Sequence, residues 1–284
     1  SGFIFQNASL LADPVTKSSS IQLSSECPPG FEQVKGRCYL RNLYRLYDSL
    51  QNSGVGGLKT GLPEIREGFT PRQIDLGRYL FYDPVLSADG SVSCGSCHHP
   101  DFGFGDGKDR SIGVTGEKVK RSAPSLWNVG FLERLFWDAR AATLEEQLQG
   151  PLYAPDEMGN NEIQLLDTLN ANQDYRRLFE ETFHVSPITP AQVYLAIAAF
   201  EASLISLNSR YDQYAHGYHD ALSHDEIEGL NIFRSFVARC AECHTPPLFT
   251  NQEIAIIGTP EPDGLPFDPG EGGLTNEPTQ RGGF

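Results

Sequence analysis

"CGSCHHPDFGFGDG", residues 94–107, contains the pattern that decides the fold, a Cys-x-x-Cys-His pentad followed by a loop rich in glycine and aromatic residues. A second pentad, "CAECH", occupies residues 240–244. In this pattern the two thiols form thioethers to the vinyl groups of a porphyrin, and the adjacent histidine becomes an iron ligand. The sequence therefore predicts two c-type haems. Their attachment residues are Cys94, Cys97 and His98 for haem 1, and Cys240, Cys243 and His244 for haem 2.

Two other chemistries use the same residue types. A thioredoxin-like redox motif needs one Cys-x-x-Cys pair, and a zinc site combines two such pairs. Because a histidine follows both pairs, two separate haems are favoured over either alternative. The other side of haem 1 then decides its role, since electron carriers fill that position with methionine or histidine and reactive haems leave it open. The one methionine of the chain, Met158, would make haem 1 an electron-transfer centre if it were the ligand.

Bulk properties limit the partners and the compartment. The chain has 284 residues, a formal charge of −15 and a pI near 4.8, which argue against nucleic acid and anionic membranes as partners. No apolar run approaches the ~20 residues that span a bilayer, and the start, "SGFIFQNASLLADP", lacks a signal peptide. Cys27 and Cys38 flank "CPPGFEQVKGRC" and could close a disulfide, with reduced thiols as the alternative. We expect an exported, periplasmic protein whose signal peptide has been removed.

Most of the chain reads as α-helical. Four segments begin with a Ser or Thr three residues before a Glu or Gln, the capping-box signature of a helix start: Thr70 to Gln73, Thr143 to Glu146, Thr189 to Gln192 and Ser223 to Glu226. The third segment carries an apolar stripe from Val193 to Leu207 that predicts a core helix. The fourth is expected to run through Val237 into the second pentad. No alternating strand pattern stands out.

Three stretches resemble the bacterial di-haem cytochrome c peroxidase and MauG superfamily. They are "LGRYLFYDPVLSADGSVSCGSCHHPDFGFGDG", "SAPSLWNVGFLERLFWDARAATLEEQLQGPLYAPDEMGN" and "GLNIFRSFVARCAECHTPPLFTN", which cover most of residues 74–252. The resemblance implies a mostly α protein of two cytochrome c-like helical domains, each binding one covalent c-type haem. We expect an N-terminal extension with little core over residues 1–65, including a short helix at 40–50. The haem 1 domain is expected over 66–207 and the haem 2 domain over 208–284.

The resemblance also assigns the distal pocket of haem 1, within "WDARAATLEEQLQGPLYAPDEMGN". It implies that Trp137 lies between the haems, that Gln147 and Pro151 face the iron, and that Glu157 is the catalytic carboxylate. These residue types suit peroxide chemistry, because a carboxylate in a partly desolvated pocket can take a proton from one oxygen and deliver it to the other. Gln147 can hydrogen-bond peroxide, and Pro151 fills space without an N–H. Met158 is not an iron ligand in the family.

The chain departs from the family at three places. Val114 stands where many members bring a histidine onto haem 1, so we expect an open haem 1, as in the MauG-like branch. Ser122 replaces the asparagine that usually helps to hold calcium, which makes calcium a weak expectation. The distal ligand of haem 2 is expected after Phe284 or in another polypeptide.

These features predict an enzyme of the di-haem peroxidase type. Haem 1 is expected to react with hydrogen peroxide, and haem 2 is expected to hold the second oxidising equivalent. The resemblance to the MauG-like branch implies that the substrate is a Trp or Tyr residue of a partner protein. One alternative is a cytochrome c peroxidase supplied with electrons by a small cytochrome c or cupredoxin. Another is a non-enzymatic di-haem electron carrier that uses Met158.

Overall fold

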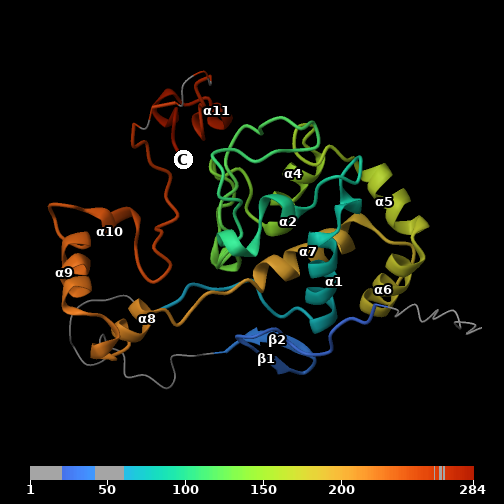
Figure 1. Ribbon diagram of the computed structural model, residues 1–284, viewed down its shortest axis with the longest axis horizontal. Helices are drawn as coiled ribbons and strands as arrows, with labels where there is room; N and C mark the ends of the chain where they lie inside the picture. Colours follow the sequence, from blue (N-terminus) through green and yellow to red (C-terminus); the bar gives the residue numbers. More distant parts are fainter. Residues whose placement is uncertain (1–20, 42–60, 259, 262–263, 265) are drawn as a thin grey trace, which may run out of the picture.

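The computed structural model describes residues 21–41, 61–258, 260–261, 264 and 266–284. Helices dominate its regular structure, as the sequence predicts. The main α-helices are α1 (Pro71–Tyr82), α2 (Cys94–Cys97), α3 (Leu144–Gln147), α4 (Gln149–Tyr153), α5 (Glu162–Ala171), α6 (Gln173–Phe183), α7 (Pro190–Ala202), α8 (Arg210–Ala215), α9 (His224–Phe233), α10 (Cys240–Cys243) and α11 (Gly272–Thr275). Figure 1 shows α1, α2 and α4 to α7 gathered in one body, with α8, α9 and α10 at its side.

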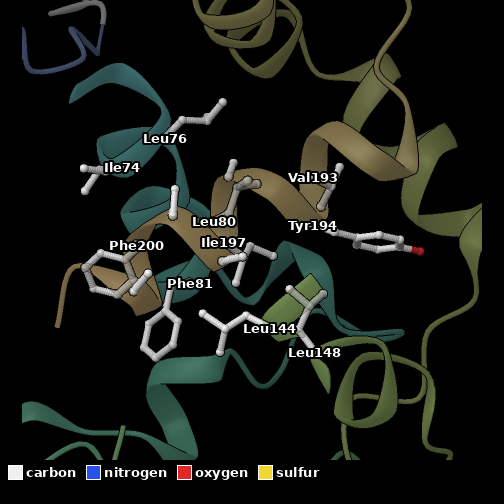
Figure 2. Packing of buried hydrophobic residues seen from close by; sticks show 14 of the residues in the cluster. Ile74, Leu76, Leu80, Phe81, Leu144, Leu148, Val193, Tyr194, Ile197 and Phe200 are labelled. Carbon is white, nitrogen blue, oxygen red and sulfur yellow. The ribbon is translucent and has the colours of Figure 1, made fainter. Parts of the chain in front are cut away.

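The core is built where α1 packs along α7 (Figure 2). Leu80 and Phe81 of α1 and Val193 and Ile197 of α7 are almost completely buried. The two helices approach backbone to backbone, because a Cβ on Gly77 would lie 1.8 Å from the carbonyl oxygen of Ala196. Only glycine permits so close a crossing. The last residue of α1, Tyr82, packs against Gly95 of the first pentad.

All four predicted helix starts are confirmed, but two helices end earlier than their apolar patterns suggest. Helix α7 ends at Ala202, so Leu204 lies beyond the helix although it is buried. Helix α9 ends at Phe233 instead of running into the second pentad, and Val237 is 95% exposed. The backbone of Arg239, which directly precedes α10, adopts the left-handed conformation with φ of 57°. In both segments the apolar pattern of the sequence extends beyond the last backbone hydrogen bond of the helix, so the pattern overestimates the length of the helix.

The N-terminal extension contributes to the core, which corrects the expectation that it would not. Strands β1 (Phe31–Val34) and β2 (Arg37–Leu40) form an antiparallel hairpin, although no strand pattern stood out in the sequence. Phe31 is 4% exposed and belongs to the main hydrophobic cluster. The hairpin is fixed by the Cys27–Cys38 disulfide and by the hydrogen bond from the Cys38 N–H to the Phe69 carbonyl, 2.8 Å. Each strand has four residues, too few for periodicity to show.

The remaining segments surround this body. The helix expected at 40–50 falls mostly outside the described residues, and Leu40 is the last residue of β2. A small second cluster joins α8 and α9, with Ala215 buried among Tyr211, Tyr214 and Leu230. The division at residues 207 and 208 stays a prediction. None of the helices in the described ranges is long and apolar enough to cross a membrane.

Candidate functional site

The first pentad forms a single helical turn, α2, with His98 as its C-cap residue. The His98 Nδ1 lies 2.7 Å from the carbonyl oxygen of Phe104. Because a carbonyl can only accept, Nδ1 carries the proton and the lone pair of the neutral ring is on Nε2. Burial lowers the pKa of His98, which favours this neutral form. This is the second-sphere arrangement that prepares an imidazole to bind a metal through Nε2.

The two thiols of the pentad are not activated nucleophiles. Burial raises the pKa of Cys94 strongly, with Glu201 adding to the effect, and burial also raises the pKa of Cys97. A redox-active Cys-x-x-Cys pair has a lowered thiol pKa, so the thioredoxin-like alternative is disfavoured. Over the described ranges, no three His, Cys, Asp or Glu side chains come together as a metal-binding group. The two cysteine pairs therefore do not form one zinc site.

A cavity of about 530 Å³ opens beside the pentad. Cys94, Cys97 and His98 line it, and the rest of its wall is largely apolar. The chain also brings to this cavity all four residues that the resemblance assigned to the distal pocket, from segments up to about 60 residues away in sequence: Trp137, Gln147, Pro151 and Glu157. Two thiols, an imidazole and an apolar wall fit a covalently attached haem.

Glu157 lies in a tight loop that follows α4. Its N–H donates to the Ala154 carbonyl at 3.0 Å, and its own carbonyl accepts from the Val114 N–H at 2.9 Å. The loop presses against Gly113, where a Cβ would lie 1.8 Å from the Asp156 carbonyl oxygen. Burial raises the pKa of Glu157, the nearby Asp156 raises it further, and Arg140 opposes them. The carboxylate is thus a stronger base than an exposed one.

The other assigned residues come from adjoining elements. Gln147 is the last residue of α3 and Pro151 lies in α4, so one short stretch of chain presents both to the cavity. Trp137 is 44% exposed and lines the same cavity. Its indole Nε1 donates to the carbonyl of Ser122 at 3.0 Å.

Two of the departures, Val114 and Ser122, can be placed in the structure, and so can Met158. Val114 offers no ligating atom, and its side chain lies against Gly159. The Ser122 carbonyl accepts a hydrogen bond from the Trp137 indole, and the calcium site stays a prediction. Met158 is 6% exposed, belongs to the main hydrophobic cluster and also lines the cavity. Because Met158 lines the cavity beside Glu157, the electron-carrier alternative, in which Met158 is the iron ligand, has to be tested by experiment.

Sequence reasoning missed Glu201. It lies on α7, is 6% exposed and lines the same cavity, and its Oε2 has no hydrogen-bond partner among the described residues. Burial, with Glu145 adding to it, raises the pKa of Glu201 to about 8. The signal was available, because Glu201 is the one charged residue in the thirteen-residue helix "PAQVYLAIAAFEA".

The second pentad repeats the local geometry of the first. Helix α10 carries the cysteines, and the His244 Nδ1 lies 3.3 Å from the Phe249 carbonyl oxygen. Phe249 and Phe104 both have a positive φ, 57° and 59°. A phenylalanine from the preceding helix packs near each histidine, with ring centroids 6.5 Å apart for Phe233 and 6.4 Å apart for the first pentad's Phe81. His244 is nevertheless exposed, whereas His98 is half-buried.

Comparison with known proteins gives this geometry a context. MauG of Methylorubrum extorquens is 36% identical over 190 residues, which are 66% of this chain and 54% of that protein. Cytochrome c551 peroxidase of Nitrosomonas europaea is 34% identical over 196 residues, 68% of this chain and 58% of that protein. The chain therefore spans little more than half the length of these curated relatives.

Solved structures agree in fold. A MauG-like protein associated with microbial copper homeostasis has a TM-score of 0.69 and 31% identity, over 80% of this chain and 73% of that one. The diheme peroxidase BthA from Burkholderia thailandensis has a TM-score of 0.65 and 28% identity, over 79% of this chain and 68% of that one. The sequence profile described as di-haem cytochrome c peroxidase matches residues 71–220. The chain belongs to the di-haem cytochrome c peroxidase family.

Proposed function

We propose that this chain belongs to a periplasmic di-haem enzyme that uses hydrogen peroxide at haem 1 to oxidise a Trp or Tyr residue of a partner protein. The observation that carries the proposal is the 530 Å³ cavity, which joins the first pentad to Glu157, Gln147 and Pro151. An electron carrier needs no proton-handling acid beside its iron, whereas cleavage of an O–O bond does.

The haem attached at the first pentad would supply the iron that binds peroxide and receives its oxidising equivalents. Glu157 would take the proton from the peroxide oxygen nearest the iron and return it to the far oxygen, which leaves as water. The raised pKa of Glu157 suits both transfers, because the group must accept and then release a proton near neutral pH. Gln147 would orient peroxide through its amide, and Pro151 would exclude water without offering a donor.

His98 would hold the iron through Nε2. Its Nδ1–H donates to the Phe104 carbonyl, which fixes the ring orientation and increases the basicity of Nε2. The matching geometry of His244 supports a second covalent haem at the second pentad. Trp137 and Leu274 of the C-terminal segment both line the cavity, and the Trp137 indole would carry holes between the two centres. A calcium ion near Ser122 is part of the proposal, with a hydroxyl in place of the usual amide oxygen.

The compartment follows from the covalent chemistry of the chain. The Cys27–Cys38 bond closes an eleven-residue separation in the structure. Disulfides of this kind persist in oxidising compartments such as the bacterial periplasm. The disulfide therefore supports an exported protein, in keeping with the two haem attachment motifs.

A cytochrome c peroxidase that draws electrons from a small cytochrome c or cupredoxin is the second candidate. It is favoured by the similar identities of relatives named peroxidase, 34% for the Nitrosomonas europaea protein against 36% for MauG. The two candidates share haem 1 and differ in the reductant. They are separated by whether peroxide treatment modifies a partner protein covalently or only oxidises a soluble cytochrome.

The test uses the holoprotein with both haems attached. We expect a high-spin ferric signal from haem 1 in electron paramagnetic resonance, and low-spin signals alone would exclude an open haem 1. Glu157→Gln should slow the peroxide-driven spectral change by about 10²-fold without changing haem content. Exposed Glu117, changed to Gln, is the matched control. An unchanged rate in Glu157→Gln would show that another group handles the proton. Mass spectrometry of candidate partners after peroxide then identifies gained oxygen or lost hydrogen.

A further inference from the structure

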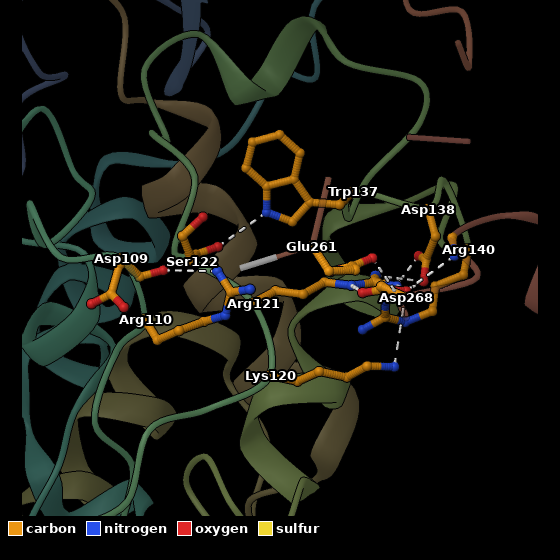
Figure 3. Close-up of polar contacts among 11 residues, drawn as sticks. Asp109, Arg110, Lys120, Arg121, Ser122, Trp137, Asp138, Arg140, Glu261 and Asp268 are labelled. Carbon is orange, nitrogen blue, oxygen red and sulfur yellow. Dashed lines mark hydrogen bonds and ion pairs between the residues drawn. The ribbon is translucent and has the colours of Figure 1, made fainter. Parts of the chain in front are cut away.

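A buried ion-pair cluster lies beside Trp137 (Figure 3). The Arg121 side chain is 20% exposed and contacts two carboxylates that are more buried still, Asp138 at 6% and Asp268 at 14%. Its Nη1 donates to Asp138 at 2.6 Å, while Nε and Nη2 donate to the two oxygens of Asp268 at 2.7 and 2.9 Å. Arg140 completes the cluster through two bonds to Asp138, 2.8 and 2.9 Å. Two arginines and two aspartates balance in charge.

The cluster holds Trp137 from both ends. At the ring end, the indole donates to the carbonyl of Ser122, the residue that follows Arg121. At the backbone end, Trp137 is followed directly by Asp138, which Arg121 binds. Among the described residues, the Ser122 carbonyl is the hydrogen-bond acceptor of the indole. The position of Trp137 therefore depends on Arg121 in two ways: through Ser122, which follows Arg121 in the chain, and through Asp138, which Arg121 binds.

The same arginine attaches the C-terminal segment. Asp268 lies 147 residues from Arg121 in sequence, after the second pentad. Its Oδ1 also accepts from the Gly270 N–H at 3.0 Å, and the guanidinium of Arg121 lies 5.4 Å from the Phe284 ring centroid. Leu274 of this segment reaches the wall of the haem 1 cavity. A bidentate pair of this kind fixes orientation as well as distance.

We propose that Arg121 is a positioning residue for electron transfer: it orients Trp137 and holds residues 268–284 against the haem 1 body, so that the path between the two haem sites depends on the Arg121–Asp268 pair. This inference rests on the proposed function, because that function requires electron transfer between the two haem sites. Arg121 is the residue that holds the groups on this path in position. Arg121 itself neither binds peroxide nor moves its proton.

The test compares three variants of the holoprotein. Arg121→Met removes both ion pairs of Arg121, leaves Asp138 paired with Arg140, and leaves Asp268 with only the Lys120 ammonium at 4.0 Å. Asp268→Asn weakens only the contact to the C-terminal segment and guards against misfolding of the first variant. Lys120→Met is the matched control, because Lys120 is 66% exposed and lies 4.0 Å from Asp268 without a hydrogen bond.

Two readouts are measured without peroxide. The chain has two tryptophans, so 5-fluorotryptophan labelling gives two ¹⁹F resonances, which Trp127→Phe assigns. We expect Arg121→Met and Asp268→Asn to shift the Trp137 resonance and to slow electron equilibration between the haems roughly tenfold or more after one-electron reduction. Lys120→Met should change neither quantity.

The outcomes separate this inference from the proposed function. An unmoved Trp137 resonance in both variants overturns the positioning role, whether or not electron transfer slows. A shifted resonance with wild-type equilibration overturns the proposed path through Trp137. If the wild-type protein fails to react with peroxide, the proposed function fails, yet both readouts still report on Arg121.

Discussion

Replacing the buried acid Glu201 with glutamine should stabilise the protein increasingly as the pH rises. The carboxyl has a pKa of about 8 in the folded chain against its usual 4.5, mainly because it is buried. Between these two values the folded state keeps a proton that the unfolded state releases. The contribution of Glu201 to the free energy of unfolding is therefore fully present below pH 4.5. It falls as the pH rises and becomes constant above about pH 8.

The magnitude follows from the width of that window. Each pH unit costs about 1.4 kcal/mol of unfolding free energy while the two states differ by one proton. Across the window from 4.5 to about 8 the total approaches ~5 kcal/mol, which is an upper value because burial effects of this kind are partly relieved by relaxation. Glu201→Gln carries no proton and keeps the shape, so the variant escapes this loss. A haem filling the cavity excludes water from Glu201 as well.

The assay is reversible urea unfolding of the holoprotein at a series of pH values from 4 to 9. The quantity of interest is the difference in unfolding free energy between variant and wild type, in which the other titrating groups cancel. This difference should grow with pH and reach a few kcal/mol above pH 8. Exposed Glu180, changed to Gln, is the control for losing a carboxylate from a helix. A difference that is constant with pH would refute the reasoning, since it would show that Glu201 is ionised in the folded state.

Three further changes test the architecture. Gly77→Ala should destabilise the helix crossing by about 2–4 kcal/mol in urea unfolding, because its Cβ would meet a backbone oxygen at 1.8 Å, whereas Gly229→Ala in open space on α9 should be neutral or slightly stabilising. Changing both Cys27 and Cys38 to serine should cost about 3 kcal/mol by the loop-closure argument, and an unaltered unfolding midpoint would show that the hairpin contacts suffice. Gly113→Ala should slow the reaction with peroxide roughly tenfold in stopped-flow measurements, by displacing the loop that carries the candidate carboxylate. A wild-type rate would mean that the loop position does not limit the reaction.

Local signals in the sequence predicted local features of the structure. The capping boxes located the starts of α1, α3, α7 and α9, since a capping bond involves residues three apart and needs no tertiary contact. The pentads likewise form short turns with histidine at the end, because five consecutive residues carry the whole pattern. Apolar periodicity placed helix ends less well, since it records which face is buried and not where the backbone bonds stop.

The assigned pocket residues could be named only through the resemblance. Gln147 and Glu157 are ordinary polar residues in sequence, and nothing in their spacing reveals that they share a cavity with His98. Glu201 left a signal, one acid in an apolar helix, but a sequence does not show whether such a group faces solvent or a cavity.

By itself the sequence predicted the haem attachment residues and determined the helical class and the starts of its principal helices, because each depends on interactions within a few neighbouring residues. The tertiary structure alone decided that Glu157, Trp137 and Glu201 surround one cavity, and that Asp268 meets Arg121. Those contacts join segments far apart in the chain. Their energies depend on burial and distance in the folded state, and no local pattern encodes either quantity.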